Sequence, residues 1–264
     1  RGKEPFKMLK NLVHSVFNQV ENPIQKIANL KQRLVFGNYP ELLKLHDADD
    51  KRDYLQELVN AYLLRDILAF ENIRNSDKIL QLLRLIAFQI GSEVSNNELA
   101  RQLSISKNTV EKYLDLLSKV FVIHSVSGFS RNLRKEISKG RKWYFYDNGL
   151  RNVLIGNVNQ LELRNDVGAL WENYAISERL KLQHYQRTLV YNFFWRTYDQ
   201  QEINWIEERG GELYAYEFKW NPKKKIKEHI AWSKSYPESH FSVIHPDNFL
   251  IWIASHKLSD KGLE

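Results

Sequence analysis

The sequence contains no cysteine, and this absence excludes several kinds of chemistry. Without thiols there is no disulfide framework, no thiolate metal ligand and no cysteine nucleophile. No apolar run approaches the roughly 18 residues that a membrane-spanning helix needs, and no signal peptide opens the chain. We therefore expect a soluble, cytoplasmic protein without a membrane partner.

Two motifs of common enzymes are also missing. The 8 histidines show no metal-ligand spacing such as His-x-x-x-His. No Gly-x-x-x-x-Gly-Lys-Ser/Thr segment offers backbone amides to nucleotide phosphates, so we expect this chain alone not to hydrolyse ATP. The only methionine, Met8, lies within an amphipathic pattern, and the first residue is Arg1. We expect the sequence to begin inside a longer protein.

The composition is that of a folded, basic protein. With 264 residues, 43% hydrophobic and 12% aromatic, the chain is long enough for two compact units, each with its own core. Lys plus Arg number 39 against 32 Asp plus Glu, which gives a net charge of +7. This balance favours a polyanionic partner such as DNA, although many proteins without one are equally basic.

Residues 1–75 are expected to form a helical segment. Apolar residues recur at helical spacing from Met8 onward, and Gly37 and Pro40 in "FGNYPELL" predict a turn between helices. Residues 51–70 then carry apolar side chains on one face and charged side chains on the other, which predicts a long helix.

Residues 76–160 are expected to form a winged helix-turn-helix. Three helical segments follow one another, and the second begins with the Ser-x-x-Glu spacing of a capping box at Ser95 and Glu98. Ser106 is the expected N-cap of the third. In a helix-turn-helix the last of these helices presents its N-terminal residues outward. Those nucleic-acid-binding candidates are Lys107, Asn108, Thr109 and Lys112.

A β-hairpin is expected to follow, formed by an apolar strand, a polar tip and the strand "KWYFYD". Its cations are further candidates for contact with DNA phosphates: Arg131, Arg134, Lys135, Lys139, Arg141 and Lys142. The same cations suit a docking surface for an upstream ATPase domain, or simply a solvated hairpin tip.

Residues 161–264 change period and are expected to form an α/β domain. A helix is followed by three β-rich runs, a further helix near "KKKIKEHIAWSKSY" and a strand at "HFSVIHP". This α-β-β-β-α-β order predicts a mixed sheet flanked by helices.

Acidic groups and one lysine are expected to meet on this sheet. Glu202 and Asn204 lie on one strand, and Glu217 and Lys219 share a face of the next because they are two residues apart. Glu172, on the preceding helix, adds another carboxylate. Carboxylates bind Mg²⁺, and a nearby lysine orients water or stabilises charge on a phosphate. The pattern indicates a metal-dependent phosphodiesterase, but a Glu-x-Lys on a half-exposed strand is also ordinary.

The motifs occur in an order that resembles a known family. "GNYPELL", "NELARQLSISKNTVEKYLDLLSKVFVI", "RNLRKEISKGRKWYFYDNGLR", "DVGALWENYAISERL" and "EINWIEERGGELYAYEFKW" follow one another as in bacterial and archaeal AAA-type ATPases. Those proteins end in a domain of unknown function that looks like a PD-(D/E)XK nuclease. The resemblance implies an α+β fold: a helical segment, a winged helix-turn-helix and a nuclease-like domain with a mixed sheet. It also implies an ATP-binding domain upstream.

The resemblance also implies a nuclease-like site. By position, its residues are Glu172, Asn204, Glu217 and Lys219, with Mg²⁺ held by Glu172, Asn204 and Glu217. Asn204 stands where the family usually has Asp. An amide oxygen brings no charge, so we expect weak metal affinity and a degenerate site.

We therefore expect the C-terminal region of an AAA-type ATPase that binds DNA or a protein partner without cleaving DNA. Two alternatives stay open. One is an active Mg²⁺-dependent DNA endonuclease, and the other is a purely protein-docking module.

Overall fold

A computed structural model describes residues 23–61, 76–131, 140–197, 199–224 and 226–254. Its first helices are α2 (Pro23–Phe36), the 3₁₀ turn η1 (Pro40–Leu43) and α3 (Ala48–Leu58). The expected turn at "FGNYPELL" is confirmed, because α2 ends at Phe36, Gly37 has φ +83° and η1 begins only at Pro40. The long helix predicted over 51–70 corresponds in part to α3, and its second half lies outside the described residues.

The middle of the chain forms α5 (Ser76–Phe88), β1 (Glu93–Val94), α6 (Asn96–Leu103), α7 (Lys107–Lys119), β2 (Ile123–Gly128) and β3 (Arg141–Phe145). Both expected caps are present. Ser95 Oγ accepts a hydrogen bond from the Glu98 amide, and Ser106 Oγ accepts one from the Thr109 amide at 3.1 Å. The expected hairpin is also present, since β2 and β3 pair antiparallel.

The C-terminal part follows the expected α-β-β-β-α-β order. Its elements are α10 (Val167–Gln186), β4 (Tyr191–Arg196), β5 (Glu202–Arg209), β6 (Glu212–Phe218), α11 (Ile230–Ser235) and β7 (His240–Ile244). The predicted start of the helix near Lys223 is wrong, because α11 begins only after an extended N-cap at His229. The lysine-rich stretch before it concentrates like charges that an isolated helix start does not offset.

Four short elements were not predicted from the sequence. They are the strand β1 (Glu93–Val94), α9 (Asn148–Leu154), the 3₁₀ turn η3 (Leu161–Leu163) and the helix α12 (Pro246–Ala254). The start of α9 is fixed by Asp147, whose carboxylate accepts a hydrogen bond from the Leu150 amide at 3.1 Å.

Among the described residues, one mixed sheet of seven strands runs in the order β1-β3-β2-β4-β5-β6-β7. The β2–β4 and β6–β7 pairs are parallel and the others antiparallel. The fold is therefore α+β with a mixed sheet. Because the hairpin β2–β3 joins β4 directly, the sheet continues across the predicted boundary between residues 160 and 161.

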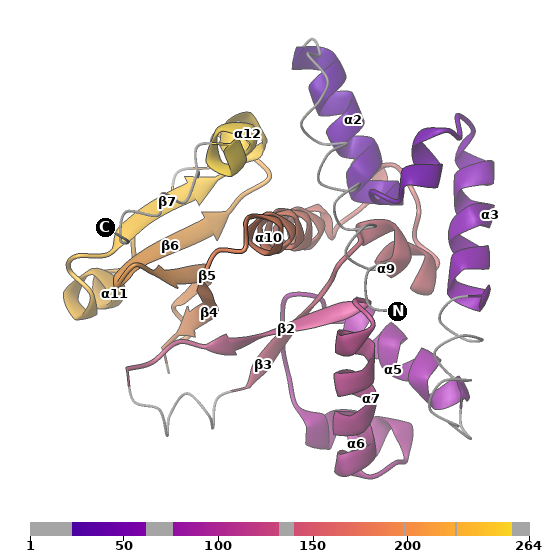
Figure 1. Cartoon of the computed structure of the whole chain (residues 1–264), viewed down its shortest axis with the longest axis horizontal. Helices are drawn as coiled ribbons and strands as arrows, with labels where there is room; N and C mark the ends of the chain where they lie inside the picture. Colours follow the sequence, from indigo (N-terminus) through magenta and orange to yellow (C-terminus); the bar gives the residue numbers. More distant parts are fainter. Residues whose placement is uncertain (1–22, 62–75, 132–139, 198, 225, 255–264) are drawn as a thin grey trace.

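The helix α10 occupies the centre of the molecule (Figure 1). It contacts β3 and β6 on one side and α2, α9 and α12 on others. Being surrounded, it buries polar as well as apolar side chains, among them Asn173, Glu178 and Arg179. Each buried polar group needs a hydrogen-bond partner, and the hydrogen bonds from α10 to neighbouring segments help to fix its position over the sheet.

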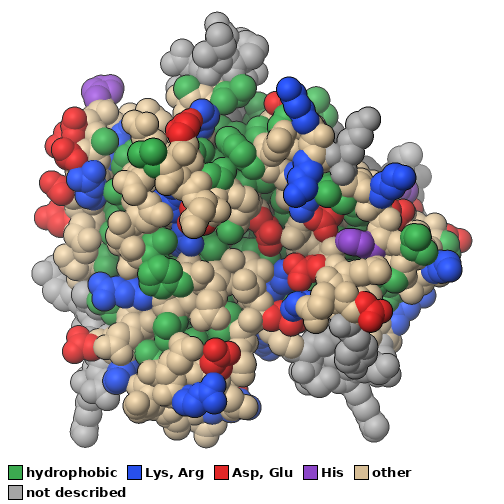
Figure 2. Space-filling model, turned by 180° about the vertical axis from the view of Figure 1, so that it is seen from behind, with side chains coloured by type: hydrophobic (Ala, Val, Ile, Leu, Met, Phe, Trp, Pro, Cys, Tyr) green, Lys and Arg blue, Asp and Glu red, His purple; other side chains and the backbone are tan. Residues whose placement is uncertain are grey.

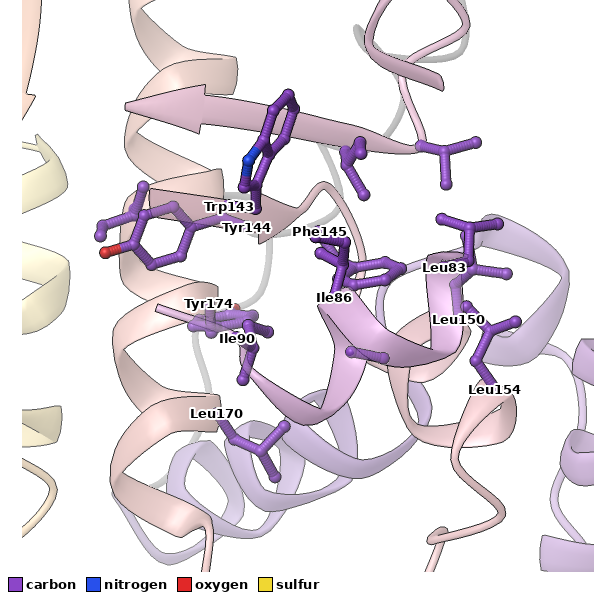
Figure 3. Close-up of a cluster of buried hydrophobic side chains, with 14 of the residues drawn as sticks. Leu83, Ile86, Ile90, Trp143, Tyr144, Phe145, Leu150, Leu154, Leu170 and Tyr174 are labelled. Atoms are coloured by element: carbon purple, nitrogen blue, oxygen red, sulfur yellow. The ribbon is translucent and has the colours of Figure 1, made fainter. Parts of the chain in front are cut away.

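The main hydrophobic core is shared by both halves of the chain. Figure 3 shows Leu83 and Ile86 of α5, Phe145 of β3, Leu150 of α9 and Leu170 of α10 in one cluster. Helix α5 therefore packs against the same core as α10, which lies beyond the predicted boundary.

Candidate functional site

The expected nuclease-like residues lie where α10 crosses β5 and β6. Glu172 is in the second turn of α10, Asn204 is in β5, Glu217 is near the end of β6, and Lys219 follows that strand. Trp205 pairs with Tyr216, so Asn204 and Glu217 lie one position further along the same strand pair. The structure thus brings the expected residues to one end of one strand pair.

A register shift in β5 directs Asn204 toward α10. Phe193 of β4 lies opposite Ile206, while Trp195 lies opposite Ile203, so Asn204 and Trp205 together face the single residue between them. This two-against-one arrangement is a β-bulge, which re-aims a side chain. Asn204 as a result reaches α10, where its Nδ2 lies 3.0 Å from Glu172 Oε2.

The orientation of the Asn204 amide is determined by the backbone. Its Oδ1 accepts a hydrogen bond from the Phe218 amide at 3.0 Å, and its Nδ2 donates to Glu172 Oε2. The reversed orientation would place an NH₂ group against the Phe218 N–H and an oxygen against the Glu172 carboxylate, which breaks both bonds. Asn204 therefore presents its nitrogen, not its oxygen, to Glu172.

Two residues of β3 complete the surroundings of Glu172. Tyr144 donates its hydroxyl hydrogen to Glu172 Oε1 at 2.7 Å. Lys142 forms an ion pair with Glu202 of β5. Burial raises the pKa of Glu172 above its usual value, the Lys142 charge and the Tyr144 hydrogen bond lower it, and the charges of Glu202 and Glu217 raise it.

Glu217 and Lys219 form a separate pair, as their spacing predicted. Lys219 Nζ donates to Glu217 Oε2 at 3.1 Å. Burial raises the pKa of Glu217, while the charges of Lys219 and then of His229 lower it. The Lys219 side chain stays partly exposed and the Glu217 side chain is nearly buried.

The residues present do not fit the Mg²⁺ ion that the resemblance implies. Such an ion needs oxygen ligands, often one or two carboxylates together with water. The Asn204 oxygen is engaged by the Phe218 amide, and its NH₂ group occupies the side toward Glu172. Within the described part of the chain, no group of three or more His, Asp or Glu side chains is placed to hold a metal ion.

The helix-turn-helix candidates lie at the exposed start of α7. Lys107, Asn108 and Lys112 are exposed, while Thr109 is half-buried and its hydroxyl lies 2.8 Å from Ser106 Oγ. The three exposed side chains are therefore accessible to a partner, whereas Thr109 mainly supports the start of the helix.

The hairpin cations divide into different environments. Arg131 is exposed and stacks on the Tyr236 ring, with its guanidinium carbon 5.5 Å from the ring centroid. Arg141 is exposed, but Lys142 is 1% exposed and faces Glu202. Lys142 therefore belongs to the surroundings of Glu172 and is not part of an exposed surface. The other candidates, Arg134, Lys135 and Lys139, lie outside the described residues.

A cleft of about 860 Å³ lies between α7, the start of α6 and β3. Its charged lining residues are Glu93, Glu98, Lys107, Glu111, Asp115 and Arg141. Carboxylates outnumber cations there, and Lys107 Nζ lies 3.6 Å from Glu111 Oε1. The face in Figure 2 likewise shows acidic and basic side chains interspersed. The excess of carboxylates makes the inside of the cleft unfavourable for a phosphate backbone.

Comparison with known proteins places the chain in a family. Residues 27–161 match the domain of unknown function DUF8612, from within α2 to the first residue of η3. The chain belongs to the DUF8612 family. Residues 167–257 match a second domain of unknown function, DUF4143, and this range contains Glu172, Asn204, Glu217 and Lys219. The two ranges meet close to the predicted boundary between residues 160 and 161.

The curated relatives are uncharacterized proteins. One from Mycobacterium bovis is 25% identical over 187 residues, which are 69% of this chain and 41% of the relative. One from Methanocaldococcus jannaschii is 23% identical over 240 residues, 89% of this chain and 50% of the relative. The chain thus spans about half the length, or less, of these relatives. No solved structure matches it.

Sequence reasoning missed the roles of Tyr144 and Lys142. A signal for both was present, because in "RKWYFYD" they are two residues apart and therefore share one face of a strand. Which face meets α10 follows only from the pairing of β2 with β4, which no local pattern in the sequence indicates.

Proposed function

We propose that this chain is a non-cleaving, DNA-binding C-terminal region of a longer, ATP-dependent protein. The length of the relatives supports the longer protein, and the resemblance to AAA-type ATPases supports ATP as the nucleotide bound upstream. The sequence given has no phosphate-binding loop of its own. ATP turnover therefore belongs to another part of the protein, and this region contributes the contact with the partner.

The order of elements in the middle of the chain supports a winged helix. Helix α5, the short strand β1, α6, α7 and the hairpin β2–β3 follow in the sequence typical of that unit, and β1 pairs with β3. In DNA-binding members the helix corresponding to α7 enters the major groove with its N-terminal residues on base edges.

The observation that carries the proposal is the exposed start of α7. Lys107 and Lys112 suit phosphate contacts, and Asn108 suits a bidentate contact with an adenine edge. Because Glu111 and Asp115 line the cleft beside them, the DNA backbone lies along the outer rim of α7 and not between α7 and β3. Arg141, at the start of β3, lines the same cleft and extends this rim, whereas Arg131 stacks on Tyr236 outside the lining of the cleft.

Salt-dependent binding to duplex DNA tests the proposal. Replacing both Lys107 and Lys112 with alanine lowers the affinity and reduces the slope of log affinity against log salt by roughly 0.9 for each phosphate that is no longer neutralised. Glu111→Gln frees Lys107 from its ion pair and raises the affinity. Lys44 and Arg52, both exposed on the N-terminal helices, provide a double alanine control that removes the same formal charge.

Two results would contradict the proposal. Absence of retention on duplex DNA at about 0.1 M salt would favour a purely protein-docking module. DNA cleavage by the native sequence in Mg²⁺, abolished by Lys219→Ala, would show an active endonuclease and would remove the non-cleaving half of the proposal.

A further inference from the structure

We infer that the Asn204 amide takes the place of a cation at Glu172, so that the cluster is a fixed clamp between α10 and the sheet. It follows that Asn204→Asp alone creates a divalent-cation site at this position. This inference concerns the start of β5 and is independent of DNA binding by α7.

Each carboxylate oxygen of Glu172 accepts a hydrogen bond from a side chain of this protein. Tyr144 Oη donates to Oε1 at 2.7 Å, and Asn204 Nδ2 donates to Oε2 at 3.0 Å. The charge of Lys142 adds favourable electrostatics from β3. A hydrogen bond on each oxygen and a nearby cation offset part of the cost of burying this carboxylate without a metal ion, although burial keeps the pKa of Glu172 above its usual value.

The clamp connects four segments through one amide. Asn204 belongs to β5, accepts from the backbone of Phe218 at the end of β6, and donates to Glu172 of α10, which Tyr144 links to β3. Asn204 is nearly buried, so the hydrogen bonds are shielded from competition by water. Alanine at this position would leave the Phe218 amide and one Glu172 oxygen without these partners.

A carboxylate at position 204 changes the chemistry but not the shape. One oxygen of the new side chain keeps the hydrogen bond from the Phe218 amide, because Asp and Asn have the same outline. The other replaces the NH₂ group and lies about 3 Å from Glu172 Oε2, the distance that now separates Asn204 Nδ2 from that oxygen. Two carboxylates at this distance repel each other unless they share a proton or a cation lies between them, and a divalent cation at neutral pH competes with that proton.

Mg²⁺ or Mn²⁺ suits such a pair. These ions are held by one or two carboxylates and several waters, and the site needs no larger group of acids. Glu172 keeps partial contact with solvent, from which such an ion can retain water, and Glu202 and Glu217 lie near it although Lys142 and Lys219 already pair with them. Arg196 is already paired with Glu93 and does not compete for Glu172.

The experiment measures thermal unfolding of the full chain in EDTA and in increasing Mn²⁺, together with direct titration of Mn²⁺ binding. The native chain is expected to show no metal-dependent stabilisation. Asn204→Asp is expected to be less stable than the native chain in EDTA. Mn²⁺ at one hundred times the dissociation constant should raise its ratio of folded to unfolded protein by about 100-fold. Adding Glu172→Gln should abolish this gain.

Asn173→Asp provides a matched control on the same helix. Asn173 is also buried and also accepts a hydrogen bond from a backbone amide, that of Phe145, at 2.7 Å. Its own Nδ2, however, donates to the Phe145 carbonyl and to Asn148, not to a carboxylate. Asn173→Asp is expected to lose stability without any recovery in Mn²⁺.

Each remaining outcome decides the question. Metal-dependent stabilisation of the native chain, abolished in Glu172→Gln, would overturn the clamp. The clamp would also be overturned if Mn²⁺ did not stabilise Asn204→Asp. The same holds if Asn204→Asp stayed unfolded in Mn²⁺ while Asn204→Ala folded. Asn204→Ala is expected to fold with reduced stability and to show no response to metal, because it removes the clamp without supplying an oxygen ligand.

Discussion

The pair Arg179–Glu207 offers the sharpest test of how α10 is held on the sheet. Both side chains are 0% exposed, and Arg179 Nε and Nη2 donate to the two Glu207 oxygens at 2.6 and 2.7 Å. Arg179 lies two helical turns beyond Glu172 on α10, and Glu207 lies beyond Asn204 on β5. Helix α10 and strand β5 are thus joined by two hydrogen-bonded pairs, Glu172–Asn204 and Arg179–Glu207.

The perturbation is Arg179→Met, which keeps most of the buried volume and removes the charge. Breaking a buried ion pair by removing one partner costs about 3 to 5 kcal/mol. Glu207 Oε1 keeps donors in Gln183 Nε2 at 2.9 Å and Trp205 Nε1 at 3.2 Å, which places the expected loss near the lower end. Arg179→Met combined with Glu207→Gln removes both charges and is expected to recover at least half of that loss.

The contribution of the Arg179–Glu207 pair to the free energy of unfolding changes with pH in a defined direction. Burial alone would raise the pKa of Glu207, but the hydrogen bonds and charge of Arg179 outweigh it, and the pKa lies below its usual value. In the native chain this contribution to stability is present above about pH 4.3 and is lost as pH falls through the lowered folded pKa. In Arg179→Met the buried carboxylate keeps only the more distant charge of Arg209, whose Nη1 lies 3.6 Å from Glu207 Oε2, so the deficit is largest at neutral pH and shrinks on acidification.

Urea unfolding followed by tryptophan fluorescence measures these differences, because Trp205 contacts the pair directly. The slope of unfolding free energy against urea should stay unchanged, which shows that only stability is altered. A loss below about 1 kcal/mol for Arg179→Met, or a double variant as unstable as the single one, would refute the reasoning.

The remaining predictions concern packing between distant segments. A Cβ at Gly149 would lie 1.9 Å from the Phe36 carbonyl oxygen, so Gly149→Ala is expected to lower the unfolding free energy by about 2 kcal/mol or more, measured by urea denaturation. Gly168→Ala, where no atom lies within 4 Å, is the control and should be neutral or slightly stabilising; an equal loss in both would contradict the clash. Because the sheet is continuous, residues on either side of position 160 are expected to unfold in one transition, which hydrogen exchange measures; two separate transitions would support independent domains.

Local features could be predicted from the sequence because they depend on neighbouring residues. Ser95 and Ser106 cap helices where their spacing indicated, and Gly37 forms the expected turn. Glu217 and Lys219 meet because alternation along a strand places them on one side. In each case the physical cause acts over four residues or fewer.

Features of the site that depend on distant pairing could not be predicted in this way. The resemblance implied that Asn204 offers an oxygen to a metal, but the orientation of its amide depends on the Phe218 amide across β5 and β6. Lys142 was grouped with the exposed hairpin cations, yet Glu202, sixty residues away, holds it inside the sheet. Neither partner is near in sequence, and a β-bulge in β5 is needed before Asn204 faces α10.

The strand β3 connects the two candidate sites of the molecule. Arg141, at its start, lines the cleft beside α7, while Tyr144, three residues later, donates to Glu172 on α10. Between them Lys142 pairs with Glu202 of β5, so the strand is held to the C-terminal sheet by an ion pair as well as by β2. A partner on α7 that displaces β3 would therefore move a hydrogen-bond donor of Glu172. The clamp at Asn204 resists that displacement, because it fixes Glu172 from the opposite side through β5 and β6. The cluster at Asn204 and the ion pair of Lys142 with Glu202 thus hold β3, α10 and β5 together through the side chains of this chain alone.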